Sequence, residues 1–199
     1  MTPSPFVIQW ATALVDRVPP ARRALDVAMG RGRHAAGLAA AGFRVFGVDL
    51  KIDAVREAIE LAALRGLVVG GWCADLTRHP LPRERFELVV VTRYLQRDLF
   101  PSIREAVVPG GAVIYETFLE GQRALGRGPT SPDHLLKPGE LPERFGGFEV
   151  VLYEEVSEPE ALARIVVRKG SALRRANFSY APRGSDTLPG LPDPCDGSA

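Results

Sequence analysis

Cysteine is scarce in this sequence of 199 residues, and its two cysteines, Cys73 and Cys195, lie far apart. Disulfide-dependent domains and cysteine-held zinc sites need more cysteines at closer spacing. The sequence therefore predicts no disulfide framework and two free thiols. The three histidines, His34, His79 and His134, also lack the spacing of metal ligands. No metal site is expected.

Long hydrophobic segments are missing as well. Charged residues or glycine interrupt every apolar run before the roughly 18–20 residues that a membrane-spanning helix needs. The first five residues, MTPSP, contain no basic residue of the kind that begins a secretory signal peptide. We therefore expect a cytoplasmic protein with no membrane partner.

Neither sign of charge dominates, because 25 Lys and Arg residues balance 24 Asp and Glu residues. Non-specific binding to nucleic acids or anionic membranes uses a strong basic excess. No nucleic-acid partner is therefore expected, and a small molecule is the favoured ligand. The chain length and a hydrophobic content of 46% suit one globular domain, present as a monomer or a homodimer.

Short apolar segments alternate with segments of helical period, which predicts an α/β fold with a doubly wound, Rossmann-like sheet. The expected strands are 23–28, 44–49, 67–74, 86–92, 111–118, 149–153 and 162–168. The expected helices are 5–16, 33–41, 52–62, 100–107 and 139–145. The last two strands leave no room for a helix between them. They should form a hairpin, which makes one strand of the seven-stranded sheet antiparallel to the rest.

Two segments fall outside this alternation. Residues 119–137 contain several glycines and prolines and have no clear period, so we expect a lid over a substrate pocket, with Arg127 and His134 facing inward. Residues 170–199 are rich in Gly, Pro, Ser and Asp, which is typical of a disordered tail. The expected folded domain is therefore 1–169.

The segment most indicative of function runs from Ala24 to Ala35, where an apolar strand leads through a glycine-rich turn into a helix. Main-chain N–H groups at such a turn suit a carboxylate or a phosphate equally well. Gly30, Gly32 and Ala35 also satisfy the G-x-G-x-x-G/A dinucleotide pattern. Asp49 follows Gly32 by 17 residues, near the roughly 20 expected for a ribose-binding acid. A nicotinamide cofactor is thus one possibility.

With these motifs the sequence resembles the class I S-adenosylmethionine-dependent methyltransferases. Their first motif, acid-x-Gly-x-Gly-x-Gly, corresponds to residues 26–32, DVAMGRG, and their proline-glycine-glycine turn to residues 109–111. The likeness is greatest to small bacterial methyltransferases of the tellurite-resistance type, which share the ending GRH at residues 32–34. The resemblance covers residues 5–169 and implies S-adenosyl-L-methionine as the cofactor.

The resemblance implies a cofactor role for residues at several strand ends. Asp26 would hold the methionine amino group, Asp49 the ribose hydroxyls and Asp75 the adenine amino group. An acid at position 26 suits an ammonium but would repel a dinucleotide pyrophosphate. Asp75 also suits a helix cap or a turn. The expected cofactor contacts are Asp26, Ala28, Gly30, Gly32, Asp49, Leu50, Ala74, Asp75, Leu76 and Thr92.

Ala28 departs from the family pattern, because it stands where the first glycine is usual. Its methyl group would crowd the methionine end of the cofactor, and alanine disfavours the positive φ that glycine permits. We therefore expect weakened or slightly displaced cofactor binding, with loss of the site as the extreme case.

The methyl acceptor should lie at the carboxyl ends of the strands, because methyl transfer is an in-line displacement that depends mainly on alignment. We expect Tyr94, Arg97, Tyr115, Glu116 and His134 to line one cavity there. In this hypothesis the two tyrosines are walls and Glu116 or His134 accepts a proton, which makes these four the candidate catalytic residues. Strand alternation could turn Glu116 away from Tyr115, and both tyrosines also suit ordinary packing.

The resulting prediction is a methyltransferase that acts on a small molecule. The segment after the fourth strand, residues 92–94, carries neither the Asn/Asp-Pro-Pro-Tyr/Phe signature of amino-methylating DNA and protein enzymes nor the Pro-Cys pair of cytosine-C5 enzymes. Two alternatives stay open: a non-catalytic S-adenosylmethionine-binding protein and an NAD(P)-dependent reductase. Against the reductase, neither Tyr94 nor Tyr115 has a lysine at helical spacing.

Overall fold

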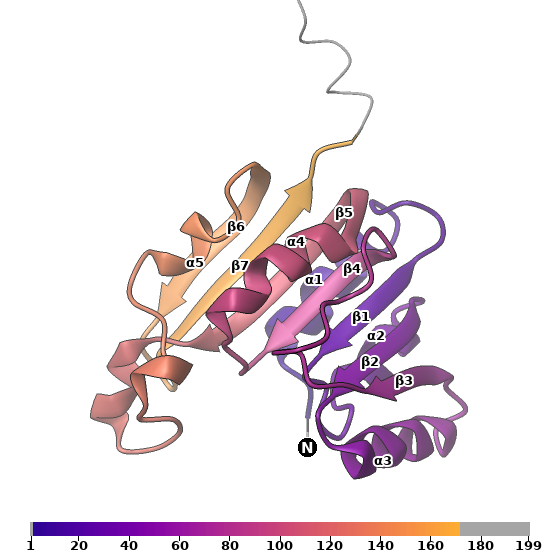
Figure 1. Ribbon diagram of the computed structural model, residues 1–199, viewed down its shortest axis with the longest axis horizontal. Helices are drawn as coiled ribbons and strands as arrows, with labels where there is room; N and C mark the ends of the chain where they lie inside the picture. Colours follow the sequence, from indigo (N-terminus) through magenta and orange to yellow (C-terminus); the bar gives the residue numbers. More distant parts are fainter. Residues whose placement is uncertain (1, 172–199) are drawn as a thin grey trace, which may run out of the picture.

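A computed structural model describes residues 2–171 of the protein (Figure 1). Nearly all of the tail expected at 170–199 lies outside the described residues. Within residues 2–171 the chain forms one seven-stranded sheet with the order β3-β2-β1-β4-β5-β7-β6. The strands are β1 (Arg23–Val27), β2 (Arg44–Asp49), β3 (Val69–Cys73), β4 (Phe86–Thr92), β5 (Val107–Phe118), β6 (Phe148–Val156) and β7 (Leu162–Lys169).

The expected fold is confirmed, including the C-terminal hairpin. β7 pairs antiparallel with both β5 and β6, whereas the other pairings are parallel. One strand therefore runs against the rest of the sheet. β4 lies at the centre with every one of its residues buried, which explains its almost continuous apolar sequence.

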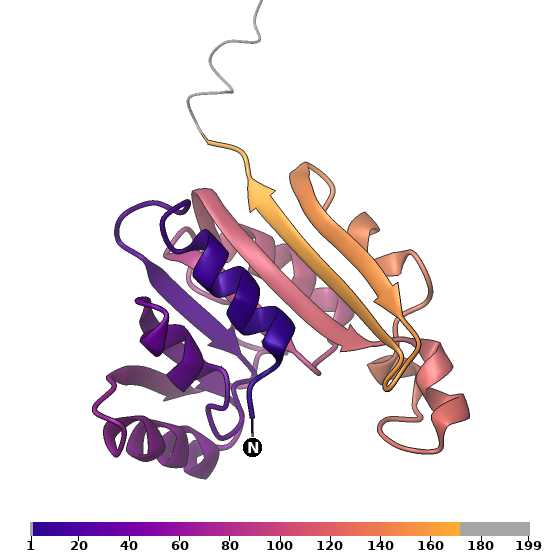
Figure 2. The same cartoon turned by 180° about the vertical axis from the view of Figure 1, so that it is seen from behind.

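Helices cover both faces of the sheet, and Figures 1 and 2 show the two sides. The apolar faces of α1, α2 and α3 pack into one core layer, and those of α4 and α5 pack into the other. The helices are α1 (Pro5–Leu14), α2 (Ala35–Ala40), α3 (Ile52–Ala63), α4 (Phe100–Ala106) and α5 (Glu140–Glu143). Short 3₁₀ helices are η1 (Arg97–Leu99), η2 (Glu120–Leu125) and η3 (Pro132–His134).

The amphipathic pattern of α3 has the expected structural result. Val55, Ala58 and Ala62 are buried at spacings of three and four residues, and α3 packs against β2 and β3. No helix within residues 2–171 has the length and apolar character needed to cross a membrane.

β5 begins at Val107, four residues before the expected start at 111. The proline-glycine-glycine turn is therefore part of the strand, where its pairing with β4 shifts register. Gly110 has a φ of +81°. A Cβ on Gly111 would lie only 2.9 Å from the Glu87 carbonyl oxygen. Both glycines are thus needed for the irregular pairing.

Candidate functional site

The turn that follows β1 has a left-handed backbone at three positions. Ala28 and Gly30 each have a φ of +52°, and Gly32 has a φ of +72°. The Met29 N–H donates to the Val48 carbonyl of β2 at 3.0 Å, which fixes the turn to the neighbouring strand. Ala28 thus adopts the conformation expected of a glycine, at a strain of about 1–2 kcal/mol.

Asp49, at the end of β2, closes this turn. Its Oδ2 accepts the Gly30 N–H at 2.8 Å, and its Oδ1 accepts the Lys51 N–H at 3.0 Å. Each carboxylate oxygen keeps acceptor capacity for a further donor. The next residue, Leu50, exposes 65% of its surface although it is apolar. The end of β2 therefore combines a fixed carboxylate with an exposed apolar surface.

Asp26 lies on β1 beside the turn and is buried. Neither of its carboxylate oxygens has a hydrogen-bond partner within the described residues. Burial raises the pKa of Asp26 to about 7, with smaller opposing effects from the positive charge of Arg33 and from the Ala35 N–H, which lies nearby but outside hydrogen-bond geometry. A carboxyl group in this condition favours a cationic or hydrogen-bond-donating ligand.

Asp75, which follows β3, forms a turn. Its Oδ1 accepts the Thr77 N–H at 2.9 Å and the Thr77 hydroxyl at 2.6 Å. These hydrogen bonds lower the pKa of Asp75. Asp75 therefore acts as a turn former in this structure, which was one of the roles expected for it. The Ala74 N–H donates to the Asp49 carbonyl at 3.0 Å, so the ends of β2 and β3 stay joined.

Tyr94 follows β4 at the carboxyl edge of the sheet, where β2 and β3 also end, and it is half-buried. Its hydroxyl donates to Gln96, whose side-chain amide donates to the Leu76 carbonyl at 3.4 Å. Burial raises the pKa of Tyr94, and nearby carboxylates, Asp75 and Asp49 among them, raise it further. Tyr94 therefore lies close to the expected cofactor contacts.

His34 joins the glycine-rich turn to the N-terminal segment and to the end of β4, a role that the sequence did not predict. Its Nε2 accepts the Ser4 N–H at 3.1 Å, so its proton is on Nδ1 and is donated to the Thr92 hydroxyl, 3.0 Å away. Burial, reinforced by the charges of Arg33 and Arg93, lowers the pKa of His34 to about 3. The only sequence signal for this buried role is the apolar α2 that begins directly after His34.

The five side chains expected to line one cavity do not do so. Tyr115 is buried in the core, where its hydroxyl donates to the Tyr94 carbonyl at 2.8 Å and its ring stacks on Phe100. Glu116 points to the opposite face of β5, because successive strand residues alternate, and pairs with Arg164 at 2.7 Å. Tyr115 is therefore a core residue rather than a cavity wall.

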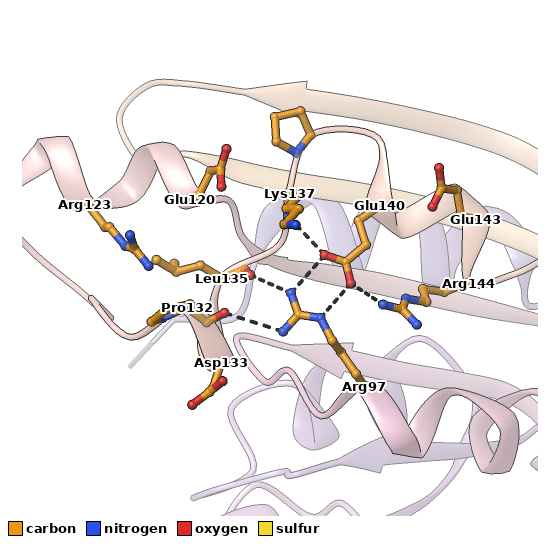
Figure 3. Close-up of a pocket in the computed structure, with 11 residues that line it drawn as sticks. Arg97, Glu120, Arg123, Pro132, Asp133, Leu135, Lys137, Glu140, Glu143 and Arg144 are labelled. Atoms are coloured by element: carbon orange, nitrogen blue, oxygen red, sulfur yellow. Dashed lines mark hydrogen bonds and ion pairs between the residues drawn. The ribbon is translucent and has the colours of Figure 1, made fainter.

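The remaining two residues of that expected set, Arg97 and His134, lie elsewhere. Arg97 lines a cavity of about 530 Å³ beside η3 and α5 (Figure 3), whereas Glu116 lines a separate cavity of about 480 Å³ beside the N-terminal segment. The side chains of His134 and Arg127 are exposed, and neither lines one of these two cavities. Arg127 instead donates to the Pro159 carbonyl.

Arg97 and Glu140 fix one end of the segment that was expected to be a lid (Figure 3). The Arg97 guanidinium donates to both Glu140 oxygens, at 2.8 and 2.9 Å, and to the Leu135 carbonyl at 2.9 Å. Glu140 also accepts from Arg144 at 2.7 Å. These hydrogen bonds, that of Arg97 above all, lower the pKa of Glu140 to about 2.

Gln122 anchors the other end of this segment. Its buried side chain accepts the Ala161 N–H at 2.8 Å and donates to the Arg127 carbonyl at 2.8 Å. Leu119 and Leu136 form a β-bridge that joins the two ends of the segment. The base of residues 119–137 is therefore fixed to the sheet and to α5.

Comparison with known proteins finds a methyltransferase family over the segment that contains the glycine-rich turn. Residues 24–111 match the family described as "Methyltransferase domain". The matched segment runs from β1 to the glycine pair in β5, so it contains Asp26, Asp49 and Asp75. No curated protein sequence matches the chain at a significant level.

Solved structures of methyltransferases share the fold. S-adenosylmethionine-dependent methyltransferase from Mesorhizobium loti is similar, with a TM-score of 0.62 and 20% identity over 81% of this chain and 98% of that one. TehB from Haemophilus influenzae has a TM-score of 0.68 and 16% identity over 85% of this chain and 63% of that one.

A third similar structure is described as "Conversion of a Disulfide Bond into a Thioacetal Group during Echinomycin Biosynthesis". Its TM-score is 0.69, with 19% identity over 88% of this chain and 86% of that one. At these identities the structural likeness establishes the fold alone. Residues 24–111 therefore match a methyltransferase domain, and the chain shares its fold with solved structures of S-adenosylmethionine-dependent methyltransferases.

Proposed function

We propose that the protein binds S-adenosylmethionine at the carboxyl ends of β1, β2 and β3 and transfers its methyl group to a small-molecule acceptor. The observation that carries this proposal is the left-handed turn at residues 28–32, closed by Asp49 and flanked by buried Asp26, which has no hydrogen-bond partner within residues 2–171. Together they offer a main-chain surface and two carboxylates to one ligand.

Asp26 fits the methionine end of this cofactor. A buried carboxylate without a partner is costly, and an ammonium group would supply both the missing charge and the missing donors. A dinucleotide would instead bring a pyrophosphate towards this carboxylate. The unpartnered state of Asp26 therefore favours S-adenosylmethionine over NAD or NADP.

Asp49 and its neighbours fit the nucleoside end. The Asp49 carboxylate is held rigidly by two main-chain N–H groups and can accept from a ribose diol. Exposed Leu50 and Ile52 offer an apolar surface to a purine. We assign Ala74, Asp75 and Leu76 to the adenine side and Thr92 to the methyl side of the same edge.

When bound, S-adenosylmethionine would supply an electrophilic methyl group on its sulfonium. The contribution of the chain is to hold and orient the reactants, since an in-line displacement depends on alignment. The buried His34–Thr92 hydrogen bond fixes the end of β4 against the turn. The proposed catalytic domain is 1–169.

Ala28 supports one alternative, a protein that binds the cofactor but does not catalyse transfer. Its methyl group lies on the left-handed turn, where a glycine would leave more room for the ligand. Such a protein would bind S-adenosylmethionine without turnover, so binding and transfer must be measured separately.

The first experiment compares ligands by thermal shift and calorimetry. S-adenosylhomocysteine should raise the melting temperature and bind at one site, whereas NAD and NADP at equal concentration should not. Release of S-adenosylhomocysteine from S-adenosylmethionine during an acceptor screen then tests transfer. Stabilisation by NAD or NADP alone would overturn the proposal, and cofactor binding without transfer to any acceptor would favour the non-catalytic alternative.

A further inference from the structure

A cavity of about 480 Å³ lies on the α1 side of the carboxyl edge, between the N-terminal segment 2–5 and the ends of β4 and β5. Its charged lining consists of Arg33, Arg93, Glu116, Glu160 and Arg164. Pro3, Pro5 and Leu162 give it apolar walls. The cavity thus offers charged groups and apolar surface together, as small-molecule sites do.

Its charges do not balance, because three arginines face two carboxylates. Arg93 pairs with Glu160 at 2.5 Å, and Arg164 pairs with Glu116 at 2.7 Å. Arg33 makes no ion pair or side-chain hydrogen bond within residues 2–171. The cavity therefore contains one arginine whose charge is not neutralised by a direct partner.

Arg33 is half-buried, and this burial, together with the nearby charge of Arg93, lowers its pKa. Two guanidinium groups held close together in a partly desolvated site favour an anion between them. A guanidinium binds a carboxylate through two parallel hydrogen bonds, which fixes the orientation of the bound group.

Arg93 is held in place by the backbone and by its neighbours. Its φ of +53° is unusual for a residue other than glycine, and its N–H donates to the Glu116 carbonyl at 2.8 Å. Its guanidinium lies 5.4 Å from the centre of the Phe118 ring. Strained backbone that the surrounding structure maintains is concentrated at functional sites.

The cavity adjoins the proposed cofactor site. Arg33 directly follows Gly32 of the glycine-rich turn, and its charge acts on Asp26 as well as on Glu116. Next to it, His34 joins Ser4 of the cavity lining to Thr92 at the end of β4. A ligand in this cavity would therefore lie beside the cofactor rather than on a remote surface.

We propose that this cavity is the acceptor subsite, and that the acceptor is a small organic molecule with a carboxylate group held between Arg33 and Arg93. The proposal rests on the proposed methyltransferase function. The size of the cavity and its apolar walls favour an organic acid over a simple inorganic oxyanion, since the volume is many times the ~30 Å³ of a water molecule.

The test screens small carboxylic acids, each paired with its neutral primary amide, against the full chain saturated with S-adenosylhomocysteine. Ligand-observed NMR measures binding, and sodium phosphate is the inorganic control. We expect carboxylates to bind at least tenfold more tightly than their amides. Equal binding of the amides, binding of phosphate but not of organic acids, or no carboxylate binder at millimolar concentration would each overturn the proposal.

Variants of Arg33 and Arg31 then test whether the carboxylate ligand binds in this cavity. Arg33→Gln should weaken the best carboxylate at least tenfold while leaving S-adenosylhomocysteine affinity within twofold. Arg31→Gln is the matched control, because Arg31 lies on the same turn but pairs with Glu57 outside this cavity. A tenfold loss of S-adenosylhomocysteine affinity in Arg33→Gln would place Arg33 on the cofactor instead and overturn the proposal.

Glu160→Gln tests whether Arg93 binds the ligand, because a purely structural role of Arg93 predicts no gain in ligand affinity. It removes the carboxylate that occupies Arg93, so the carboxylate ligand should bind more tightly, by about threefold or more. Unchanged or weaker binding would contradict the role of Arg93.

If S-adenosylhomocysteine itself fails to bind the wild-type chain, the proposed function fails, and carboxylate binding to the ligand-free chain still tests the cavity.

Discussion

The backbone N–H of Gly30 donates a hydrogen bond to the carboxylate of Asp49, 2.8 Å away, so the end of β2 directly holds the turn that follows β1. The two groups are 19 residues apart in sequence. Because this carboxylate also accepts the Lys51 N–H, its position is fixed before any ligand arrives. The site is preorganised on two adjacent parallel strands.

Replacing Asp49 tests this arrangement. Asp49→Ala should weaken S-adenosylhomocysteine binding by about 1.5–3 kcal/mol, since a ribose diol would lose a charged acceptor. Isothermal calorimetry measures the change. Asp53→Ala is the control, because Asp53 is an exposed carboxylate nearby on α3 and should leave affinity unchanged. Equal affinity of Asp49→Ala and wild type would refute the ribose assignment.

Asp26 should make the ligand-free protein less stable as pH rises. Its pKa is about 7 in the folded chain against 3.8 as the ordinary value, so the unfolded chain loses its proton first. The stability contributed by protonated Asp26 is complete below pH 3.8 and is lost as pH rises to about 7. The total loss is on the order of 4 kcal/mol.

Urea unfolding of wild type and Asp26→Asn at pH 4.5 and 8 measures this effect. The variant should gain stability relative to wild type at the higher pH, because asparagine does not ionise. S-adenosylhomocysteine should also bind wild type more tightly as pH rises through about 7, since its ammonium favours ionised Asp26. Adenosine, which lacks the ammonium, is the control ligand. A parallel pH response for both ligands would contradict the contact.

Ala28→Gly should improve cofactor binding. Glycine adopts the φ of +52° without strain and removes the methyl group from the turn. Because the strain is already present without ligand, its relief should raise the free energy of unfolding by about 1 kcal/mol. S-adenosylhomocysteine affinity should rise as well, because the methyl group no longer crowds the ligand. Glu84→Gly is the control, because Glu84 also has a positive φ, of 46°, but lies at the opposite end of the sheet, just before β4. Equal improvement in both variants would show that the methyl group of Ala28 is irrelevant.

His34→Gln should destabilise the protein most at neutral pH. The folded pKa of about 3 lies below the ordinary 6.5, so the stability that His34 contributes is complete above pH 6.5 and is lost as pH falls towards 3. The gap between wild type and variant in urea unfolding should shrink by about 2 kcal/mol between pH 7.5 and 5. The exposed His79, as His79→Gln, should show no such change. A constant gap would mean that His34 is not held neutral.

Glu140→Gln should loosen the segment at residues 119–137. The neutral amide loses the ionic hydrogen bonds from Arg97 and Arg144, so the free energy of unfolding should fall by about 1–3 kcal/mol. With a folded pKa of about 2, the contribution of Glu140 is present above pH 4.5 and lost towards pH 2. Hydrogen exchange should rise across the segment. Exposed Glu143, on the same helix, is the control, and equal exchange in Glu140→Gln and Glu143→Gln would contradict the anchoring role.

The sequence by itself determined the seven strands, the five α-helices and the C-terminal hairpin found within residues 2–171. These features depend on local periodicity and on the length of the connections, both of which are visible in one stretch of chain. It also located Asp26 and Asp49 at strand ends, because carboxyl ends of parallel strands share one edge. The boundaries of β5 were less predictable, since its start depends on a register shift against β4.

The tertiary structure alone decided which side chains meet. Tyr115 and Glu116 are adjacent in sequence, yet one is buried in the core and the other lines a charged cavity. The His34–Thr92 hydrogen bond joins residues 58 apart in sequence, and the Arg97–Glu140 pair joins residues 43 apart. Burial, ion pairing and the pKa values that follow from them depend on such distant partners. The local sequence pattern does not predict these distant partners, because desolvation and charge contacts arise only when the chain is folded.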